Sequence, residues 1–307
     1  MTSINPTLHI VGAGAIGSLL AAGAQRQHLA YQRYPRTMAN IPHYATWIDN
    51  SKVPLSMHTA QANVLAKNDV LVLPLKVYQL ESALSYWRPY LVHSPALVLL
   101  HNGMGGWEIA QQILGPHYPL LLATTSHGAF KQIDDKGKAF ITYSGQGSTQ
   151  IGAPNKGNRL SPPLSDAINL LHNALPPVST PDNIVHALWQ KLSVNMVINP
   201  LTALNHIQNK HILDSQFSDV RRALCKEFVD VANACGLVFN ETKVHEHVLA
   251  VAKATGENYS SMHQDVLHGR PTEIGAINGY IVEMAKKKGI HVPVNTLMVE
   301  RIKALNL

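Results

Sequence analysis

The sequence predicts an α/β N-terminal domain with a doubly wound parallel sheet, followed by an all-α C-terminal domain. Three observations support this. Short Val- and Leu-rich runs alternate with helical patterns in the first half, and a glycine-rich turn joins the first run to a helix. Strand patterns nearly vanish after the prolines Pro176, Pro177 and Pro181. A length of 307 residues suits two domains. We expect them to span 1–178 and 179–307.

Apolar runs with few charges predict the buried strands of the first domain. Helical patterns separate several of them, for example at Ile16–Gln27 and Trp107–Leu114. Strands separated by helices are typical of βαβ units in a parallel sheet. The expected strands are Leu8–Val11, Leu29–Gln32, Val70–Leu75, Ala96–Leu100 and Leu120–Thr125.

Two further runs, Phe140–Tyr143 and Thr149–Ile151, flank the turn Gly145-Gln146-Gly147. This pattern predicts an antiparallel pair at the edge of the sheet. Beyond the proline cluster Asp182 is a candidate cap, and Gly236 and Gly289 are expected to end helices. The expected helices are Asp182–Asn205, Phe217–Cys235, Glu241–Thr255, Thr272–Lys288 and Val294–Leu305.

Composition limits the class of protein. Charged residues make up only 14% of the chain, and the one basic run, Lys286–Lys288, lies where a helix should end. Lysines suit the negative end of a helix dipole, so we expect no nucleic-acid partner despite the net charge of +6. No apolar run approaches the ~18 residues that span a bilayer, so no membrane partner is expected.

The only cysteines, Cys225 and Cys235, lie in one predicted helix, about 15 Å apart by its rise. That distance is too long for a disulfide, and two unpaired thiols indicate a cytoplasmic protein. The sequence has 17 histidines, but His245 and His247 point to different helix faces and no HExxH occurs. We therefore expect no metal site. The oligomeric state stays open, with a homodimer as one option.

A glycine-rich loop directly follows the first predicted strand and opens a helix. Such glycines allow a tight turn, close approach of a pyrophosphate, and packing of helix on strand, while the helix N-terminus attracts phosphate. The alternative is a glycine turn needed only for packing. Its position favours a Rossmann-type dinucleotide site, and the expected cofactor contacts are Gly12, Ala13, Gly14, Ala15, Ile16 and Gly17.

The segment around the second predicted strand selects the dinucleotide. NAD-binding proteins usually carry an acidic residue there for the ribose 2′-hydroxyl. Residues 29–36, LAYQRYPR, contain no acid and two arginines. Because a guanidinium can grip a 2′-phosphate, we expect NADP(H), bound by Arg33 in preference to Arg36. The alternative is that Arg33 is an ordinary solvated side chain.

Two more polar segments follow predicted strands, at the end where open α/β sheets bind ligands. In the first, Lys76 could reach cofactor phosphate or ribose, with Gln79 assisting. In the second, HNGMG, Asn102 offers an amide to the nicotinamide, the ribose or the substrate. A simple turn is the alternative for HNGMG.

A helical stretch, WQKLSVNMVINPLTAL, sets Lys191, Asn195 and Asn199 four residues apart. Steps of four advance only about 40° around a helix, so the three side chains share one face over roughly 12 Å. An ammonium and two amides in a line suit a small, oxygen-rich ligand. The alternative is the exposed face of an amphipathic helix.

With these segments in order, the chain resembles the 2-dehydropantoate 2-reductase, or ketopantoate reductase, family. The resemblance runs through GAGAIG, LKVYQ, HNGMG, TTSHGA, WQKLSVNMVINPLTAL, ENYSSMHQD and GRPTEIGAINGYIVEMAKKKGIHVP. It implies a Rossmann domain joined to a helical domain, with the active site in the cleft between them. It also implies NADPH-dependent reduction of 2-dehydropantoate, a 2-keto acid, to (R)-pantoate for pantothenate biosynthesis.

The resemblance also implies roles for individual residues. Lys191 matches the catalytic lysine, and Glu273 matches a glutamate beside the substrate and the nicotinamide ribose. The implied substrate contacts are Asn195, Asn199, Asn209 and Ser261, and the implied cofactor contacts are the glycine loop, Lys76, Asn102, Ala129 and Glu273. From its place in HNGMG we also expect Asn102 to contact the substrate. The sequence departs from many relatives in carrying Lys210-His211 for Gly-Glu, His263 for Leu and Gly275 for Asp.

Reduction of a ketone places negative charge on its oxygen, which needs a proton donor. We expect Lys191 to be that general acid, Asn195 and Asn199 to orient the substrate, and Glu273 to hold the substrate's hydroxyl. Two alternatives remain. One is an NADPH-dependent reductase of another 2-keto acid, and the other is a catalytically silent NADPH-sensing protein.

Overall fold

The computed structural model describes residues 6–57, 59–154 and 161–305. The chain divides into two compact units. The first consists of Met1–His101 and Gly106–Val185, and the second of Asn102–Gly105 and His186–Leu307. The short segment Asn102–Gly105 therefore belongs with the C-terminal residues, although it lies far from them in the sequence. The domain boundary expected at residue 178 stays a prediction.

The first unit contains a seven-stranded sheet in the order β11-β10-β7-β6-β5-β1-β2. Strands β7, β6, β5, β1 and β2 are parallel, whereas β10 runs antiparallel to β7. The bounds are β1 Leu8–Val11, β2 Tyr31–Tyr34, β5 Val70–Leu73, β6 Ala96–Leu100, β7 Leu120–Thr125, β10 Thr149–Gly152 and β11 Val178–Ser179. The parallel α/β sheet is thus confirmed, with β2 beginning two residues later than expected.

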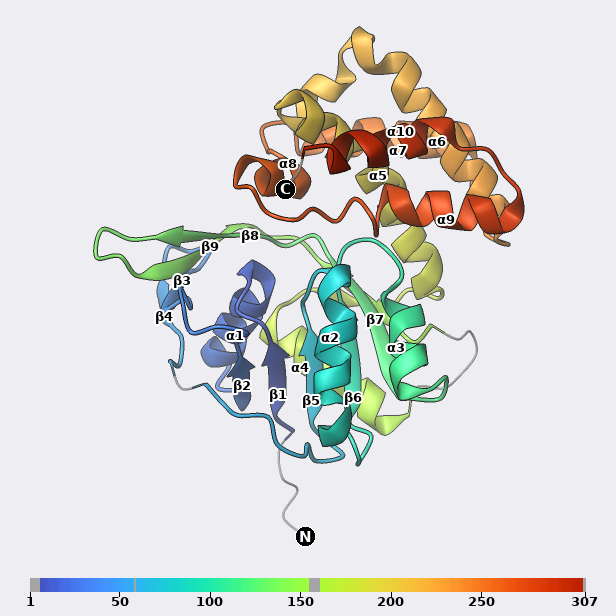
Figure 1. Ribbon diagram of the computed structural model, residues 1–307. Coiled ribbons are helices and arrows are strands. Elements are labelled where there is room, and N and C mark those ends of the chain that lie inside the picture. Colours follow the sequence, from blue (N-terminus) through green and yellow to red (C-terminus); the bar gives the residue numbers. More distant parts are fainter. Residues whose placement is uncertain (1–5, 58, 155–160, 306–307) are drawn as a thin grey trace. The chain divides into compact units, whose positions relative to one another are not determined.

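Helices cover both faces of this sheet (Figure 1). Helix α1 (Ala15–Arg26) packs against α4 (Pro162–Ala174), and α2 (Val77–Trp87) packs against α3 (Gly106–Leu114). A one-turn helix, η1 (Arg88–Tyr90), extends α2. Apolar side chains of β1, β5 and β6 are fully buried beneath these helices, which explains why the strands read as continuous Val and Leu runs.

The expected antiparallel pair at the sheet edge is wrong. The strand that begins near Phe140 is β9 (Ala139–Gly145), and it lies in a separate sheet of order β4-β3-β9-β8. Its antiparallel partner is β8 (Gly128–Ile133), while β3 (Tyr44–Thr46) runs parallel to β9 and pairs with β4 (Lys52–Pro54). Strand β10 pairs with β7 instead.

A local turn explains the β8–β9 hairpin in place of the expected pair. The Asp134 side chain accepts hydrogen bonds from the backbone N–H groups of Lys136 and Lys138, and Gly137 has a φ of +74°. An Asp that folds back on its own turn, followed by a glycine with positive φ, is a strong hairpin signal. The chain therefore forms its hairpin at this turn and not at the later Gly145-Gln146-Gly147 turn.

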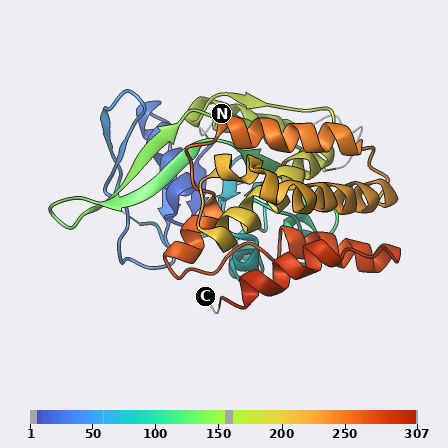
Figure 2. The ribbon, with the colours of Figure 1, turned by 90° about the horizontal axis from the view of Figure 1, so that it is seen from above.

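The second unit is helical. Its longest helix is α5 (Ile184–Asn205), and α6 packs against α7, α9 and α10, which can be followed from above in Figure 2. The other bounds are η2 Asn209–Leu213, η3 Ser215–Phe217, α6 Ser218–Ala234, α7 Glu241–Ala254, α8 Ser261–Leu267, α9 Asn278–Lys288 and α10 Pro293–Lys303. Within the described ranges no helix is both long and apolar enough to cross a membrane.

Two helix starts of this unit differ from expectation by more than one residue. Helix α5 begins at Ile184 rather than Asp182, and α9 begins at Asn278, six residues after the expected Thr272. Before α9 the chain forms turns, in which the Glu273 carbonyl accepts from the N–H groups of both Ala276 and Ile277. The Ala276 carbonyl accepts from Met104 N–H at 2.8 Å, so it serves a long-range contact instead of a helical one.

Candidate functional site

The glycine loop joins β1 to α1 in the arrangement expected of a phosphate site. Gly12 has a φ of +96°, and a Cβ there would lie 2.9 Å from Leu75 Cδ2. A Cβ on Gly17 would lie 3.0 Å from the Gly12 carbonyl oxygen and 3.1 Å from Pro74 Cγ. These two glycines therefore serve the turn and the close packing of helix on strand.

Gly14 differs from its neighbours because a Cβ there would meet no protein atom within 4 Å. Packing does not require a glycine at this exposed position. It is also the N-cap of α1, and α1 has neither a side-chain cap nor an acidic residue in its first turn. The start of α1 thus has no side-chain cap and no acidic side chain, and a helix N-terminus of this kind suits the pyrophosphate of a dinucleotide.

Arg33 lies inside β2 and is only 2% exposed, so it is not a solvated side chain. Its Nη1 donates to the carbonyl oxygens of Pro42 and Ser56 at 3.2 and 3.0 Å. Nη2 is buried without a hydrogen-bond partner among the described residues. Burial lowers the pKa of the guanidinium. Nη2 is therefore a buried donor without a partner in the described structure, whereas Arg36 is exposed.

Lys76 and Gln79 lie at the start of α2, directly after β5. The Gln79 side-chain oxygen accepts from Lys76 N–H at 3.1 Å, and Gln79 N–H donates to the Lys76 carbonyl at 2.8 Å. This reciprocal pair fixes the helix start, so the Gln79 oxygen has a structural task. Ala129 lies in the other sheet, on β8, paired with Tyr143 of β9.

In the second unit the structure brings Lys191 and Asn102 together. Lys191 Nζ donates to Asn102 Oδ1 at 2.9 Å. Asn102 reaches this position because the segment 102–105 packs against the turn before α9: a Cβ on Gly103 would lie 2.5 Å from the Ala276 oxygen. Gly103 thus permits a close approach of two backbones, which the simple-turn alternative does not explain.

Burial lowers the pKa of Lys191 to about 8, while the negative charge of Glu273 acts in the opposite direction. Glu273 is itself buried, with 5% of its surface exposed. A lysine whose pKa is lowered toward neutral pH, and which lies beside a carboxylate and an amide, can deliver a proton near neutral pH. Lys191, Asn102 and Glu273 form the candidate catalytic cluster.

Asn195 and Asn199 follow Lys191 on α5, which confirms the helix that spaces them. Asn199 is buried at 6% exposure, and Asn195 is half-buried. Neither side-chain amide has a hydrogen-bond partner in the part of the chain that the structure describes. Since a buried amide normally pairs, Asn199 in particular fits contact with a ligand.

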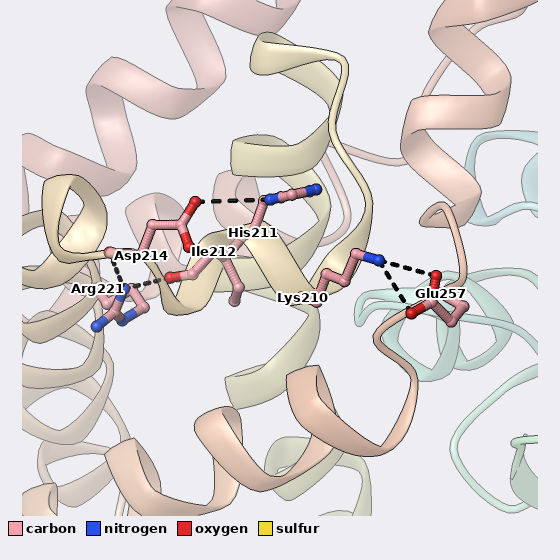
Figure 3. A network of polar contacts seen from close by, with 6 residues as sticks. All are labelled: Lys210, His211, Ile212, Asp214, Arg221 and Glu257. Atoms are coloured by element: carbon pink, nitrogen blue, oxygen red, sulfur yellow. Dashed lines mark hydrogen bonds and ion pairs between the residues drawn. The ribbon is translucent and has the colours of Figure 1, made fainter.

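Asn209 begins η2, which is held firmly against the residues after α7 (Figure 3). Its N–H donates to the Asn258 carbonyl, and its side-chain Nδ2 donates to Thr255 Oγ1 at 3.0 Å. Oδ1 is buried and has no hydrogen-bond partner among the described residues, although a buried acceptor normally has one. Lys210 adds an ion pair, with Nζ 2.9 Å from both carboxylate oxygens of Glu257.

Arg221 holds the other side of the same segment. Its Nη1 donates to the carbonyl oxygens of Ile212 and Asp214, as Figure 3 shows. His211, the second departure from relatives, forms an ion pair with Asp214 at 3.6 Å when it is protonated. The substitutions at Lys210 and His211 therefore leave Asn209 anchored by contacts of its own.

Ser261 is exposed at the first position of α8, and the buried polar contacts belong to its neighbour Ser260. Ser260 Oγ caps α8 by accepting from His263 N–H, and it lies 2.7 Å from Thr202 Oγ1 of α5. The predicted site did not include this link between α5 and α8. Ser260 directly precedes α8, and a serine in that position is typical of a helix N-cap, so the sequence could have indicated this role.

The third departure, His263, is buried and stacks on Tyr259 with ring centroids 4.6 Å apart. Burial and the nearby histidines His206 and His268 lower its pKa. Gly275 lies in the turn before α9, where a Cβ would meet no atom within 4 Å. Across the described residues no group of three His, Cys, Asp or Glu side chains could hold a metal ion.

Two family descriptions match the chain. Residues 8–156 match "Ketopantoate reductase PanE/ApbA", and residues 183–306 match "Ketopantoate reductase PanE/ApbA C terminal". The 2-dehydropantoate 2-reductase of Vibrio cholerae is 35% identical over 301 residues, covering 96% of each chain. That of Escherichia coli O157:H7 is 33% identical over 297 residues, covering 96% of this chain and 93% of the relative.

Solved structures share the fold. The ternary structure of D-mandelate dehydrogenase with NADH and anilino(oxo)acetate aligns with a TM-score of 0.85 at 22% identity, over 98% of this chain and 100% of the other. The probable 2-dehydropantoate 2-reductase of Bacillus subtilis aligns with a TM-score of 0.75 at 25% identity, over 97% of this chain and 99% of the other. From the two matched segments and the identity to curated relatives, the chain belongs to the ketopantoate reductase PanE/ApbA family.

Proposed function

We propose that this protein reduces 2-dehydropantoate to (R)-pantoate with NADPH, a step of pantothenate biosynthesis. The observation that carries the proposal is the hydrogen bond from Lys191 to Asn102 beside Glu273, in a chain whose other unit keeps an open phosphate cradle. Curated relatives across nearly the whole chain are named 2-dehydropantoate 2-reductase. A sensing protein would need the cradle, but it would not need a lysine tuned for proton transfer.

Each cluster has a task in this reaction. The first unit would hold the cofactor: the N-terminus of α1 at Gly14 takes the pyrophosphate, and Arg33 Nη2 takes the 2′-phosphate. Lys76 and Ala129 are further proposed cofactor contacts. When bound, NADPH supplies the hydride that reduces the substrate ketone.

The second unit would handle the substrate. As the ketone carbon is reduced, negative charge develops on its oxygen, and Lys191 donates a hydrogen bond and then its proton to that oxygen. Lys191 is left neutral and recovers a proton from solvent. Asn195, Asn199, Asn209 and Ser261 orient the substrate, and Glu273 holds its hydroxyl.

The test is a comparison of substrates. Oxidation of NADPH is followed by absorbance with 2-dehydropantoate, with 2-ketoisovalerate, and without substrate. Preference for 2-dehydropantoate supports the proposal. Preference for 2-ketoisovalerate, which lacks the hydroxyl, would mean a reductase of another 2-keto acid. Tight NADPH binding without turnover of either acid would mean a sensing protein.

Two further proposals concern the setting of the enzyme. Both cysteines, Cys225 and Cys235, are free, which supports a reducing compartment such as the cytoplasm. We also propose a homodimer. A ketopantoate reductase from Staphylococcus aureus is described as dimeric, and light scattering of the purified protein tests the same state here.

A further inference from the structure

A proline interrupts the hydrogen bonding of the helix that carries Lys191. Pro200 lies inside α5, where it has no N–H to donate to the carbonyl of Met196, four residues earlier. Met196 is fully buried, so water cannot replace the missing donor. A buried carbonyl left without a partner would destabilise the helix at this point.

Asn278, the first residue of α9, supplies the missing hydrogen bond. Its Nδ2 donates to the Met196 carbonyl oxygen at 2.9 Å, and the residue has no exposed surface. Asn is a poor choice for a buried helical position on propensity alone. An amide nitrogen aimed at the one carbonyl that Pro200 leaves unpaired explains its presence.

A chain of hydrogen bonds fixes the direction of this amide. The Asn278 Nδ2 group also donates to Asn295 Oδ1 at 2.9 Å, and Asn295 Nδ2 donates to Glu227 Oε2 at 2.8 Å. An ionised carboxylate only accepts, so Glu227 orients Asn295, which in turn presents an oxygen to Asn278. Glu227 also accepts from the N–H groups of Val294 and Asn295 at the start of α10.

We propose that Asn278 is a positioning residue for the reaction: it replaces the donor that Pro200 removes and thereby holds the Lys191–Asn195–Asn199 face of α5 in place. Met196 directly follows Asn195, and Pro200 directly follows Asn199. The carbonyl that Asn278 holds is therefore on the turn between the two substrate amides. The inference rests on the proposed function, because it assigns Asn278 to the substrate side of that reaction.

The test is a cycle of variants. Asn278→Leu keeps a similar volume but removes the donor, and Pro200→Ala restores an N–H that can pair with Met196 within the helix. Asn233→Leu is the matched control. Asn233 also makes two amide hydrogen bonds, both to Phe239, but at the exposed end of α6. Each protein is assayed for turnover of the keto acid (kcat and kcat/KM), for NADPH affinity, and for amide hydrogen exchange in peptides of α5.

We expect Asn278→Leu to lower kcat/KM about tenfold or more, the scale of an unpaired buried acceptor, with NADPH affinity unchanged. Exchange should quicken in the Asn195–Asn199 turn. Adding Pro200→Ala should recover most of the loss in both measurements, which a merely structural defect at Asn278 would not do. Asn233→Leu should lower Tm without changing kcat/KM.

Two outcomes would overturn the inference. One is wild-type kcat/KM in Asn278→Leu, whatever its rate of exchange, and the other is no recovery when Pro200→Ala is added. If Asn278→Leu does not fold, the recovery by Pro200→Ala is measured as soluble yield and exchange in the double variant, and its absence counts against the proposal. Failure of the proposed function is separate, since the wild-type protein would then not turn over 2-dehydropantoate at all.

Discussion

Lys191 Nζ donates to Asn102 Oδ1 at 2.9 Å, across 89 residues of sequence. An amide oxygen can only accept, so it occupies one N–H of the ammonium and restrains the flexible side chain. This hydrogen bond joins the HNGMG segment, which follows β6, to helix α5.

Removing Lys191 should abolish chemistry and spare cofactor binding. In Lys191→Ala we expect kcat to fall by about 10²–10⁴, the usual contribution of a general acid, with NADPH affinity unchanged. Steady-state kinetics and fluorescence titration of NADPH measure the two. Lys287→Ala, on the exposed surface of α9, is the control. Near-normal turnover in Lys191→Ala would remove this residue from the mechanism.

The pH profile should report the lowered pKa of Lys191. Reduction needs its protonated form, so kcat/KM should be level below about pH 8 and decline above it. Asn102→Ala removes an acceptor that favours the charged ammonium, and the alkaline decline should move to lower pH. A profile that stays flat well above the pKa of Lys191, or an unmoved decline in Asn102→Ala, would contradict the assignment.

The same residue should cost the protein stability. The pKa of Lys191 is lowered from 10.5 to about 8 in the folded state, so the unfolded chain binds the proton more tightly. The penalty is fully present below about pH 8 and is relieved as pH rises toward 10.5. Lys191→Met should therefore raise Tm near neutral pH, and the gain over wild type should shrink as pH approaches 10.5, as measured by thermal denaturation.

Two glycines of the cradle should behave differently on substitution by alanine. Gly14→Ala adds a methyl group that meets no protein atom, so the fold should tolerate it while NADPH binding weakens. Gly12→Ala adds strain at a φ of +96° and a contact with Leu75, so Tm should drop. Titration calorimetry and thermal denaturation separate the two effects. Unchanged NADPH affinity in Gly14→Ala would argue against pyrophosphate at this position.

Arg33 should select the phosphorylated cofactor. Arg33→Ala should weaken NADPH much more than NADH, because only NADPH carries the 2′-phosphate. Since Arg33 is buried and donates to two carbonyls, the variant should also lose stability, so affinities must be measured well below its Tm. Arg36→Ala, at an exposed position, provides the comparison. Equal losses for NADPH and NADH would leave Arg33 with a structural role alone.

Sequence patterns anticipated the parts of the fold that depend on local burial. The Val and Leu runs of β1, β5 and β6 and the helix carrying Lys191 follow directly from periodicity. The second sheet was not predicted, because β3 and β4 are only three residues long and β3 pairs with a strand that is distant in sequence. The start of α9 was predicted too early. The Ala276 carbonyl accepts a hydrogen bond from Met104 N–H, a long-range contact that no local sequence pattern reveals.

The site shows the same division. The spacing of Lys191, Asn195 and Asn199 could be read from helix geometry, and the glycine loop from its strand-turn-helix setting. The partner of Lys191 could not be predicted, because the sequence left Asn102 equally suited to contact the cofactor or the substrate. Only the structure shows that its side-chain oxygen accepts from Lys191. Nor could the burial of Arg33 be predicted, since β2 begins two residues later than expected and turns this side chain inward.

Residues Asn102–Gly105 group with His186–Leu307, and this limits how the enzyme can be cut into fragments or recombined with a relative. A single cut near residue 178 would yield a C-terminal fragment whose Lys191 has lost its acceptor. A chimaera that exchanges only that fragment between relatives would pair the lysine of one protein with the asparagine of another. An exchange that keeps Lys191 and Asn102 from the same protein therefore transfers two segments, residues 102–105 and the helices that follow residue 186.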